Sequence, residues 1–483
     1  MKRSILIAAL ACAAAARAGA QQGEPAPIAI THAAVVDVES GRTLADQTVV
    51  VRGSRIAQVG PAARVAVPAG ARVVDGRGRW VIPGLWDMHV HAAFVGLDNL
   101  FMPLLAANGV TGVREMFSTI PMRDTVRARI RRGALAGPRI VGSGHILDGD
   151  PPIWPGSVVA RDAAGARRAV DSLARAGADF IKVYSRLSPE AFAAAADEAK
   201  RRGLPFAGHV PSLVTVEAAS DAGMASIEHL TGIVGACSPL DPSRRGAVAA
   251  AVASPRGWDS ASVISRAQAA EVLARYDPAA CRALARRLAR NGTVMVPTLV
   301  TLHATGFFDD TTLARDPRMR YMPKMFAMQW NPRTDFRFRA LTPADWENRH
   351  QLYRRQLEIV RLLRQEGVRF MAGTDLSNPF TFPGFSLHEE MALLAGAGFT
   401  PLDALRAATL EPARFLGLAD SLGTVAAGKA ADLVVLDADP LADIRNVSRI
   451  HAVLLDGRLI DAAERERILH AAEALAGGQP PAR

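Results

Sequence analysis

The chain has 483 residues, of which 49% are hydrophobic, so it is long and apolar enough to bury a large core. Its formal net charge is +10, but the arginines are dispersed through alanine-rich stretches, and neither a compact basic block nor a nucleic-acid-binding motif accompanies them. We therefore expect no nucleic-acid partner. The positive charge is expected to affect only solubility and the weak electrostatic steering of ligands.

Residues 1–20 have the layout of a secretory signal peptide. Lys2 and Arg3 give a positive start, residues 5–16 form an apolar run, and the small residues that end at Ala20 offer a cleavage site. The run is too short to span a bilayer, and no other segment is predicted to be transmembrane. We therefore expect a periplasmic or secreted protein. A lipoprotein anchored through Cys12 is the second interpretation, because the residues before it only weakly resemble a lipoprotein cleavage box.

The two ends of the mature chain share one pattern. Short alternating apolar segments, broken by turn residues, occur between residues 28 and 75 and return at 431–436 and 451–458. They predict a small β-sandwich domain built from residues 26–80 and 416–462. An alanine-rich helix over 462–476 is expected to follow this domain, and the final segment, 463–483, holds that helix and the tail.

Between these blocks, residues 81–415 alternate strand-like segments with amphipathic helices such as 189–202, 279–291 and 351–366. This alternation predicts a parallel sheet with crossover helices. The expected strands are Trp80–His91, Gly109–Glu115, Arg139–Ser143, Asp179–Tyr184, Pro205–His209, Ala225–His229, Val294–Leu299 and Arg369–Asp375. Eight such units predict the α/β class and a (β/α)₈ TIM barrel. The oversized segment 300–350 is rich in methionine and aromatic residues, which favours a lid at the active-site face.

Six potential metal ligands fall on five of the predicted strands, at or near their ends. They are His89, His91, Lys182, His209, His229 and Asp375. In a (β/α)₈ barrel the carboxyl ends of the strands face one mouth, so these side chains are expected to converge. A single histidine at a strand end is more often a hydrogen-bonded structural residue. The joint pattern instead predicts a metal site.

Several runs of sequence resemble the amidohydrolase superfamily. The run Gly78–His91 resembles its entry strand, and the run Ala427–Asp437 resembles the return into its β-sandwich. Gly208-His-Val-Pro, Ser226-Ile-Glu-His-Leu and Ala372-Gly-Thr-Asp are similar to its later metal strands. Within the superfamily the chain most resembles the imidazolonepropionase-like and metal-dependent Xaa-Pro dipeptidase (prolidase) branch, whose members carry a bridging carboxylated lysine.

This resemblance implies a site for two divalent metal ions, with zinc favoured and carboxylated Lys182 in the bridging position. It assigns His89, His91 and Asp375 to one ion, His209 and His229 to the other, and Lys182 to both. The chemistry supports the assignment, because a buried ammonium beside two cations is disfavoured, whereas a neutral amine can capture carbon dioxide as an anionic carbamate.

The expected reaction is hydrolysis of a carbon–nitrogen amide bond in a dipeptide or an N-acyl amino acid. Metal binding lowers the pKa of a bound water towards about 7, and Asp375 acts first as base and then as acid. Three alternatives stay open. One is opening of a cyclic amide such as an imidazolone, or of a lactone. The second is a one-metal deaminase-like enzyme, and the third is an inactive barrel that serves as a periplasmic binding protein.

Three further residues are candidate substrate contacts. Tyr184 lies two residues beyond Lys182 on the same strand face, Arg114 could pair with a substrate carboxylate or a neighbouring acid, and His388 could reach the pocket or be an ordinary helix residue. The expected partner is a small-molecule substrate, and homo-oligomerisation stays open. Cys237 and Cys281 could form a disulfide in an oxidising compartment, but the sequence does not place them within bridging distance.

Overall fold

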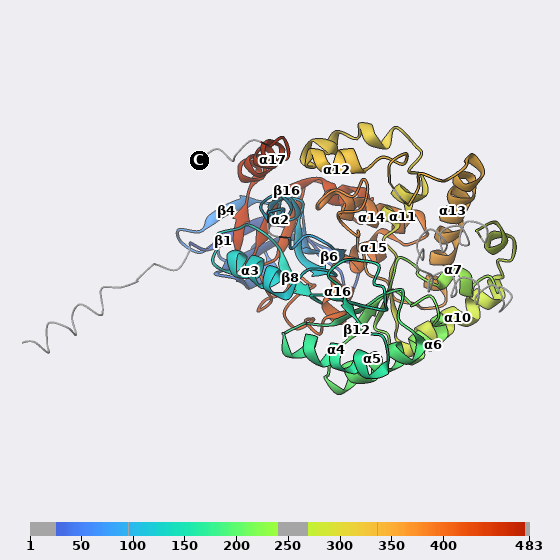
Figure 1. Cartoon of the computed structure of the whole chain (residues 1–483). Coiled ribbons are helices and arrows are strands. Elements are labelled where there is room, and N and C mark those ends of the chain that lie inside the picture. Colours follow the sequence, from blue (N-terminus) through green and yellow to red (C-terminus); the bar gives the residue numbers. More distant parts are fainter. Residues whose placement is uncertain (1–25, 95, 240–268, 336, 479–483) are drawn as a thin grey trace, which may run out of the picture.

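The computed structural model describes residues 26–94, 96–239, 269–335 and 337–478. The predicted signal peptide and Cys12 lie outside the described residues. Figure 1 shows the strands of both chain ends on one side of the molecule and the helices α4, α5, α10 and α13 on the other.

Both ends of the chain contribute to one eight-stranded sheet. Its strands are β1 (Ile28–Asp37), β2 (Arg42–Arg52), β3 (Arg55–Pro61), β4 (Arg72–Asp75), β5 (Trp80–Pro83), β15 (Leu433–Leu436), β16 (Ile450–Leu455) and β17 (Arg458–Ile460). The order is β17-β16-β15-β5-β1-β2-β3, with β4 paired to β1. The two blocks meet where β15 pairs antiparallel with β5. Alternate side chains of these strands, such as Val49 and Val51 of β2, form a separate buried cluster.

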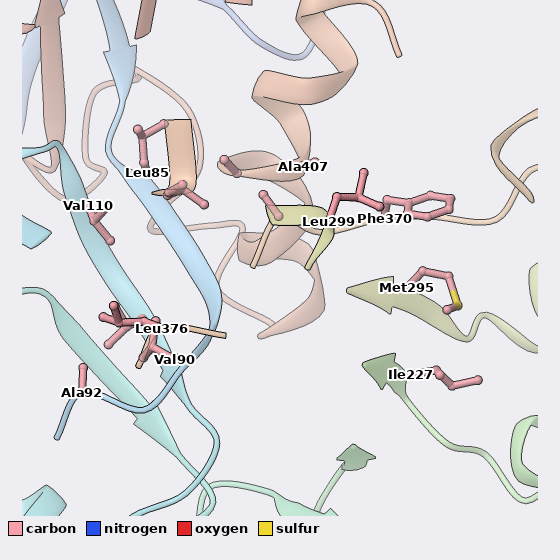
Figure 2. Packing of buried hydrophobic residues seen from close by; sticks show 14 of the residues in the cluster. Leu85, Val90, Ala92, Val110, Ile227, Met295, Leu299, Phe370, Leu376 and Ala407 are labelled. Carbon is pink, nitrogen blue, oxygen red and sulfur yellow. The ribbon is translucent and has the colours of Figure 1, made fainter. Parts of the chain in front are cut away.

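The remaining strands are parallel and form the barrel. They are β6 (Leu85–Val90), β7 (Val110–Glu115), β8 (Arg139–Gly142), β9 (Ile146–Asp148), β10 (Val158–Val159), β11 (Ile181–Val183), β12 (Phe206–Gly208), β13 (Ser226–Glu228) and β14 (Val294–Val296). They form a β6-β7-β8 sheet and a β10-β9-β11-β12-β13-β14 sheet. Parallel bridges join Met295 to Phe370 and Val90 to Leu376, so residues 370–376 connect β14 back to β6. Figure 2 shows Val90 and Leu376 side by side in the barrel core.

Three predicted strands differ from the structure, and one of them, 294–299, ends early at Val296 because α11 begins at Leu299. The segment 80–91 divides at Gly84 into β5, which belongs to the terminal sheet, and β6, which belongs to the barrel. A Cβ on Gly84 would lie 2.1 Å from the hydroxyl oxygen of Thr111, so only glycine allows β7 to approach here. The predicted last strand, 369–375, makes bridges but no continuous ladder. The carboxylate of Asp87 accepts the backbone N–H of Thr374, which a ladder would otherwise use.

Helices cover the barrel. They are α2 (Asp98–Ala107), α3 (Ile120–Arg131), α4 (Ala163–Arg175), α5 (Pro189–Arg201), α6 (Val216–Asp221), α7 (Ile233–Ala236), α10 (Pro278–Asn291), α11 (Leu299–Gly306), α12 (Lys324–Gln329), α13 (Pro343–Gln365), α14 (Phe385–Gly396), α15 (Pro401–Ala407), α16 (Leu410–Phe415) and α17 (Ala462–Ala476). Helix α13 begins earlier than predicted, because Thr342, just before Pro343, forms a capping box with Asp345 in the first turn. No helix among the described residues is both long and apolar enough to cross a bilayer.

The oversized segment after β14 is more structured than a plain loop. It contains α11, α12 and the short 3₁₀ helices Leu313–Arg315 and Pro317–Tyr321. Its buried aromatic residues Phe308 and Trp330 pack on Phe380, with ring centroids 5.6 and 5.4 Å apart. Phe380 follows closely after Asp375, so the segment packs on the chain that leaves the barrel mouth.

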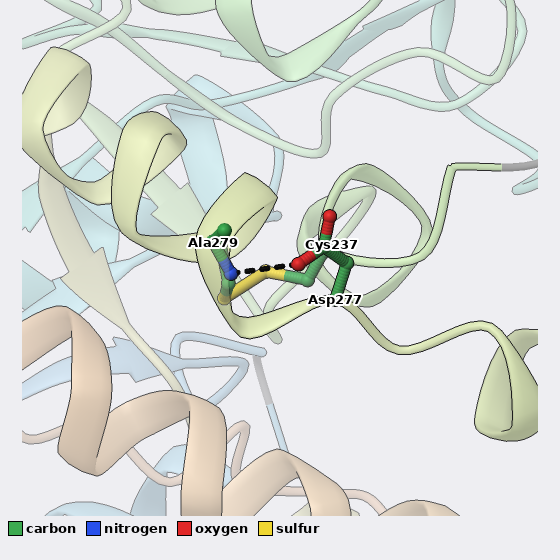
Figure 3. Close-up of a disulfide and its surroundings, with 4 residues drawn as sticks. Cys237, Asp277 and Ala279 are labelled. Carbon is green, nitrogen blue, oxygen red and sulfur yellow. Dashed lines mark hydrogen bonds between the residues drawn. A yellow bond between two sulfur atoms is a disulfide. The ribbon is translucent and has the colours of Figure 1, made fainter.

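A disulfide joins Cys237, at the end of α7, to Cys281 in α10, with 4.3 Å between the Cα atoms. Both cysteines are fully buried. Figure 3 shows this bridge beside Asp277, whose carboxylate accepts the backbone N–H of Ala279 at the start of α10. The question that the sequence left open, whether the two cysteines can pair, is thereby answered.

Replacing both cysteines by serine is expected to lower the free energy of unfolding by about 2–4 kcal/mol, because the crosslink restricts a long loop of the unfolded chain. The sequence separation across the bridge is 44 residues. Urea unfolding of the oxidised protein, the reduced protein and the double variant measures this loss. Equal stability of the oxidised and reduced proteins would contradict the prediction.

Candidate metal centre

Four imidazole rings and one carboxylate gather at the strand ends. The ring centroids of His89 and His229 are 4.4 Å apart, those of His89 and His91 are 5.3 Å apart, and those of His209 and His229 are 5.0 Å apart. A carboxylate oxygen of Asp375 lies 3.4 Å from Nε2 of His89 and 3.2 Å from Nε2 of His91. Offering one ligand atom each, His89, His229 and Asp375 fit within 4.8 Å of one another.

Three of the four histidines are held through Nδ1. His89 donates its Nδ1–H to Glu228 at 2.8 Å, while Nδ1 of His209 shares a hydrogen bond with the Ser185 hydroxyl and that of His229 with the Thr298 hydroxyl. The carboxylate of Glu228 fixes the tautomer of His89 and leaves its Nε2 free for a metal ion, while the two hydroxyls fix the orientation of the other two rings. Nε2 of His89 is buried and has no hydrogen-bond partner.

The backbone at this mouth is strained. His229, Thr298 and Asp375 adopt positive φ angles of 57°, 49° and 57°, a region that residues other than glycine seldom occupy. His229 and Thr298 lie just after β13 and β14, Asp375 lies within the segment 370–376, and the three side chains meet in the cluster. Strained residues of this kind concentrate at functional sites, where the surrounding structure holds them in place.

The electrostatics suit neutral imidazoles beside an ionised acid. Burial, together with the charge of Lys182, lowers the pKa of His89 and of His209 well below the usual histidine value. Neutral imidazole is the form that binds metal ions. Burial by itself raises the pKa of Asp375, but His229, His91 and Lys182 outweigh that effect and lower it to about 2. The carboxylate is therefore ionised at neutral pH.

Lys182 lies on β11, next to Ala207 and Gly208 of β12, and only 1% of its surface is exposed. Burial lowers the pKa of its amine to about 8, although Glu228 and Asp375 act in the opposite direction. A Cβ on Gly208 would lie 2.9 Å from Cδ and 3.2 Å from Cε of Lys182. The absence of a side chain at Gly208 therefore makes room for the methylene groups of Lys182, whose amine reaches the histidine cluster.

The donor set fits divalent metal ions. Imidazoles tethered at Nδ1, an ionised carboxylate and an unpartnered buried Nε2 are the ligand types and the arrangement that zinc sites use. A carboxylated Lys182 would add two more oxygens. The tightest group, His89 with His229 and Asp375, crosses the predicted division of the histidines between two ions.

Tyr184 borders the cluster, as the sequence predicts. Its ring stacks on that of His209 with the centroids 4.0 Å apart, and its hydroxyl accepts a hydrogen bond from the indole N–H of Trp154. Trp154 lies in the loop after β9. The carboxylate of Asp148, at the end of β9, accepts the backbone N–H groups of Gly149 and Ile153 in this loop. Tyr184 and Trp154 thus form one aromatic side of the site.

The structure does not bring the other two predicted substrate contacts to the open side of the cluster. Arg114 is 1% exposed and pairs with Glu228, the neighbouring acid that the sequence left as an alternative. His388 donates to the backbone carbonyl of Asn108, which precedes β7 at the end opposite the histidine cluster. Strand and helix patterns placed both residues near the pocket, but they did not show which way the side chains turn.

Sequence reasoning missed Glu228 and Asp87. Asp87 is fully buried and accepts hydrogen bonds from the backbone of His89 and from both the backbone and the hydroxyl of Thr374, so it ties β6 to the segment that carries Asp375. Strand alternation was the available signal. It places Asp87 on the same strand face as His89, and it places Glu228 on the face of Ser226, inside segments that are otherwise apolar.

A barrel whose mouth gathers four histidines, a lysine and an aspartate defines a class of metal-dependent hydrolases. Residues 80–460 match the family model of the amidohydrolase family, and the chain belongs to that family. It is a hydrolase that acts on carbon–nitrogen bonds.

Relatives place the chain in the imidazolonepropionase and prolidase-like branch. Imidazolonepropionase of Pseudomonas putida (strain GB-1) is 27% identical over 441 residues, which cover 86% of this chain and 93% of that protein. Among solved structures, bottromycin amidohydrolase superposes with a TM-score of 0.73 at 26% identity, covering 94% of this chain and 92% of the other. A prolidase-like protein of Bifidobacterium longum gives 0.65 at 25% identity, with coverages of 93% and 99%.

Proposed function

We propose that the protein hydrolyses the amide bond of a dipeptide or an N-acyl amino acid at a site that holds two divalent metal ions. The observation that carries this proposal is the convergence of Lys182 with the four histidines and Asp375 in one buried cluster. A single ion does not need a buried lysine beside four imidazoles, whereas a carboxylated lysine supplies the anionic bridge between two ions. Zinc suits these ligand types best.

The ligands would be His89, His91, His209, His229, Asp375 and carboxylated Lys182. Divalent ions, when bound, activate water and polarise a carbonyl group. Asp375 accepts the proton of the attacking water at its carboxylate and delivers it to the nitrogen that leaves. Its low pKa of about 2 keeps it ionised and ready as a base. The aromatic side formed by Tyr184 and Trp154 excludes water and supports an apolar part of the substrate.

Opening of a cyclic amide is the second candidate. It is favoured by the similarity to imidazolonepropionase, which extends over most of both chains. The same ligands and the same base serve both reactions, so the two candidates differ in the shape of the substrate and not in the catalytic groups.

A substrate panel with a metal count is expected to show two metal ions per chain and turnover of dipeptides or N-acyl amino acids, with apolar or aromatic side chains preferred. The panel includes an imidazolone, a lactone and a purine, so that each alternative has its own positive result. One metal ion together with purine deamination would overturn the two-metal proposal. Two ions without turnover on any substrate would favour a binding protein.

We also propose export to the periplasm or beyond the cell. The buried disulfide between Cys237 and Cys281 supports an oxidising compartment, because such bridges are rare in the reducing cytosol.

A further inference from the structure

We propose that Arg114 and Glu228 are positioning residues that fix the His89 imidazole and thereby hold the metal ion that His89 binds. This inference rests on the proposed function, since it concerns the same metal site. It assigns a role to Arg114, for which the sequence allowed two interpretations, a substrate contact or the partner of a neighbouring acid.

Glu228 is the link between the two residues. One of its carboxylate oxygens accepts from the Arg114 guanidinium at 2.8 Å and from the Ser226 hydroxyl at 2.5 Å, and the other accepts from Nδ1 of His89 at 2.8 Å. Arg114 and Glu228 are both buried, with side-chain exposures of 1% and 0%. Every oxygen of this carboxylate therefore has a donor, and the direction of its bond to His89 is fixed.

Arg114 is itself held on several sides. Its Nε donates to the backbone carbonyl of Met88 at 2.7 Å, and Nη1 donates to the Ser226 hydroxyl at 2.9 Å. The guanidinium carbon lies 5.6 Å from the ring centroid of Phe180 and 5.3 Å from that of Phe415. Because Met88 directly precedes His89 on β6, the arginine fixes both the backbone that carries the ligand and the acid that orients its ring.

His89 differs from His209 and His229 in the charge of its hydrogen-bond partner. His209 and His229 are tethered by neutral hydroxyls, at 3.0 and 2.7 Å, whereas His89 is tethered by a carboxylate. A carboxylate acceptor makes an imidazole a stronger ligand than a hydroxyl does, and loss of such a partner costs about 10–100-fold in metal affinity. The buried arginine balances the charge of Glu228, which would otherwise be costly to bury.

The decisive experiment measures metal affinity and not only activity. Zinc is removed with a chelator of known affinity, and the metal per chain is followed for the wild type, Glu228→Gln, Arg114→Lys and Ser226→Ala. We expect Glu228→Gln and Arg114→Lys to lower the affinity of one of the two ions by about 10–100-fold, and Ser226→Ala to cause a smaller loss. The visible absorption spectrum of the cobalt-loaded protein should change in the same order.

Arg123→Lys is the matched control. Arg123 is a buried arginine that donates to the backbone carbonyls of Gly142 and Gly177 and does not contact the cluster. Its variant should lower the unfolding temperature of the metal-free protein as much as Arg114→Lys does, yet leave metal affinity unchanged. Equal affinity losses in the two arginine variants would mean that Arg114 is merely structural and would overturn the inference.

The wild-type metal count separates this inference from the proposed function. A wild type with fewer than two ions refutes the two-metal proposal, whatever the variants do. A wild type with two ions and unchanged affinity in Glu228→Gln and Arg114→Lys refutes the positioning role alone. If Glu228→Gln does not fold, Arg114→Lys and Ser226→Ala decide the question, because both leave the carboxylate in place.

Discussion

Asp375→Asn is expected to lower turnover by about 10²–10⁴-fold, the usual contribution of a general base, while the protein stays folded. Asparagine has the same shape and tolerates the positive φ of 57° at this position. The backbone bond from residue 375 to the carbonyl of His89 does not involve the side chain and remains. The amide, however, cannot accept the proton of the attacking water. The measurement is kcat at saturating metal, with the metal per chain counted in the same sample.

Asp432→Asn is the control for this variant. Asp432 is also buried, but it lies just before β15 of the terminal sheet, where it pairs with Arg139 of β8 and accepts the backbone N–H of Asp456. The control should lose stability and keep the turnover of each folded molecule. Turnover of Asp375→Asn close to that of the wild type, at full metal occupancy, would remove the aspartate from its role as base.

Lys182→Met is expected to reduce the metal content below two ions per chain and to abolish measurable turnover, because the bridging anion is lost while a side chain of similar length fills the space. Lys182→Ala leaves room beside Gly208, and a short carboxylic acid such as acetate should restore part of its activity. Lys429→Met is the matched control, since Lys429 is a partly buried lysine that donates to the backbone carbonyls of Ala419 and Leu422. Full activity of Lys182→Met would refute the bridge.

The bridge also predicts how activity returns to the metal-free enzyme. Only the neutral amine captures carbon dioxide, and the pKa of Lys182 in the metal-free protein is lowered to about 8 by burial. At constant dissolved carbon dioxide, the recovery rate after zinc addition should therefore rise about tenfold per pH unit below pH 8 and level off above it. Recovery at the same rate in buffer freed of carbon dioxide would contradict carboxylation.

The histidine cluster with Asp375 could be predicted from sequence because strand periodicity fixes where these residues lie. His89 and His91 alternate on one strand, and the carboxyl ends of parallel strands share one mouth, so distant histidines had to converge. The terminal sheet was predictable for a similar reason, since its strands need partners that only the other chain end supplies. The bounds of α17 also agree with the predicted helix, because its alanine-rich pattern is local.

The features that escaped prediction depend on side-chain direction and on competition between polar groups. The side chain of Arg114 turns away from the open side of the histidine cluster, because it pairs with Glu228 on another strand. The last barrel strand is irregular, because Asp87 takes a backbone N–H that a ladder would use. The disulfide required a distance between Cys237 and Cys281 that no local pattern encodes.

During synthesis, β5 emerges early with only β1 beside it, and its other edge stays uncovered until β15 leaves the ribosome. Trp80 pairs with Leu436, so this contact is among the most distant in the chain. Such pairing is slow, and an uncovered apolar edge invites wrong partners in the meantime. Since only Gly84 separates β5 from β6, the strand that carries His89 gains its final anchorage only once β15 has been made.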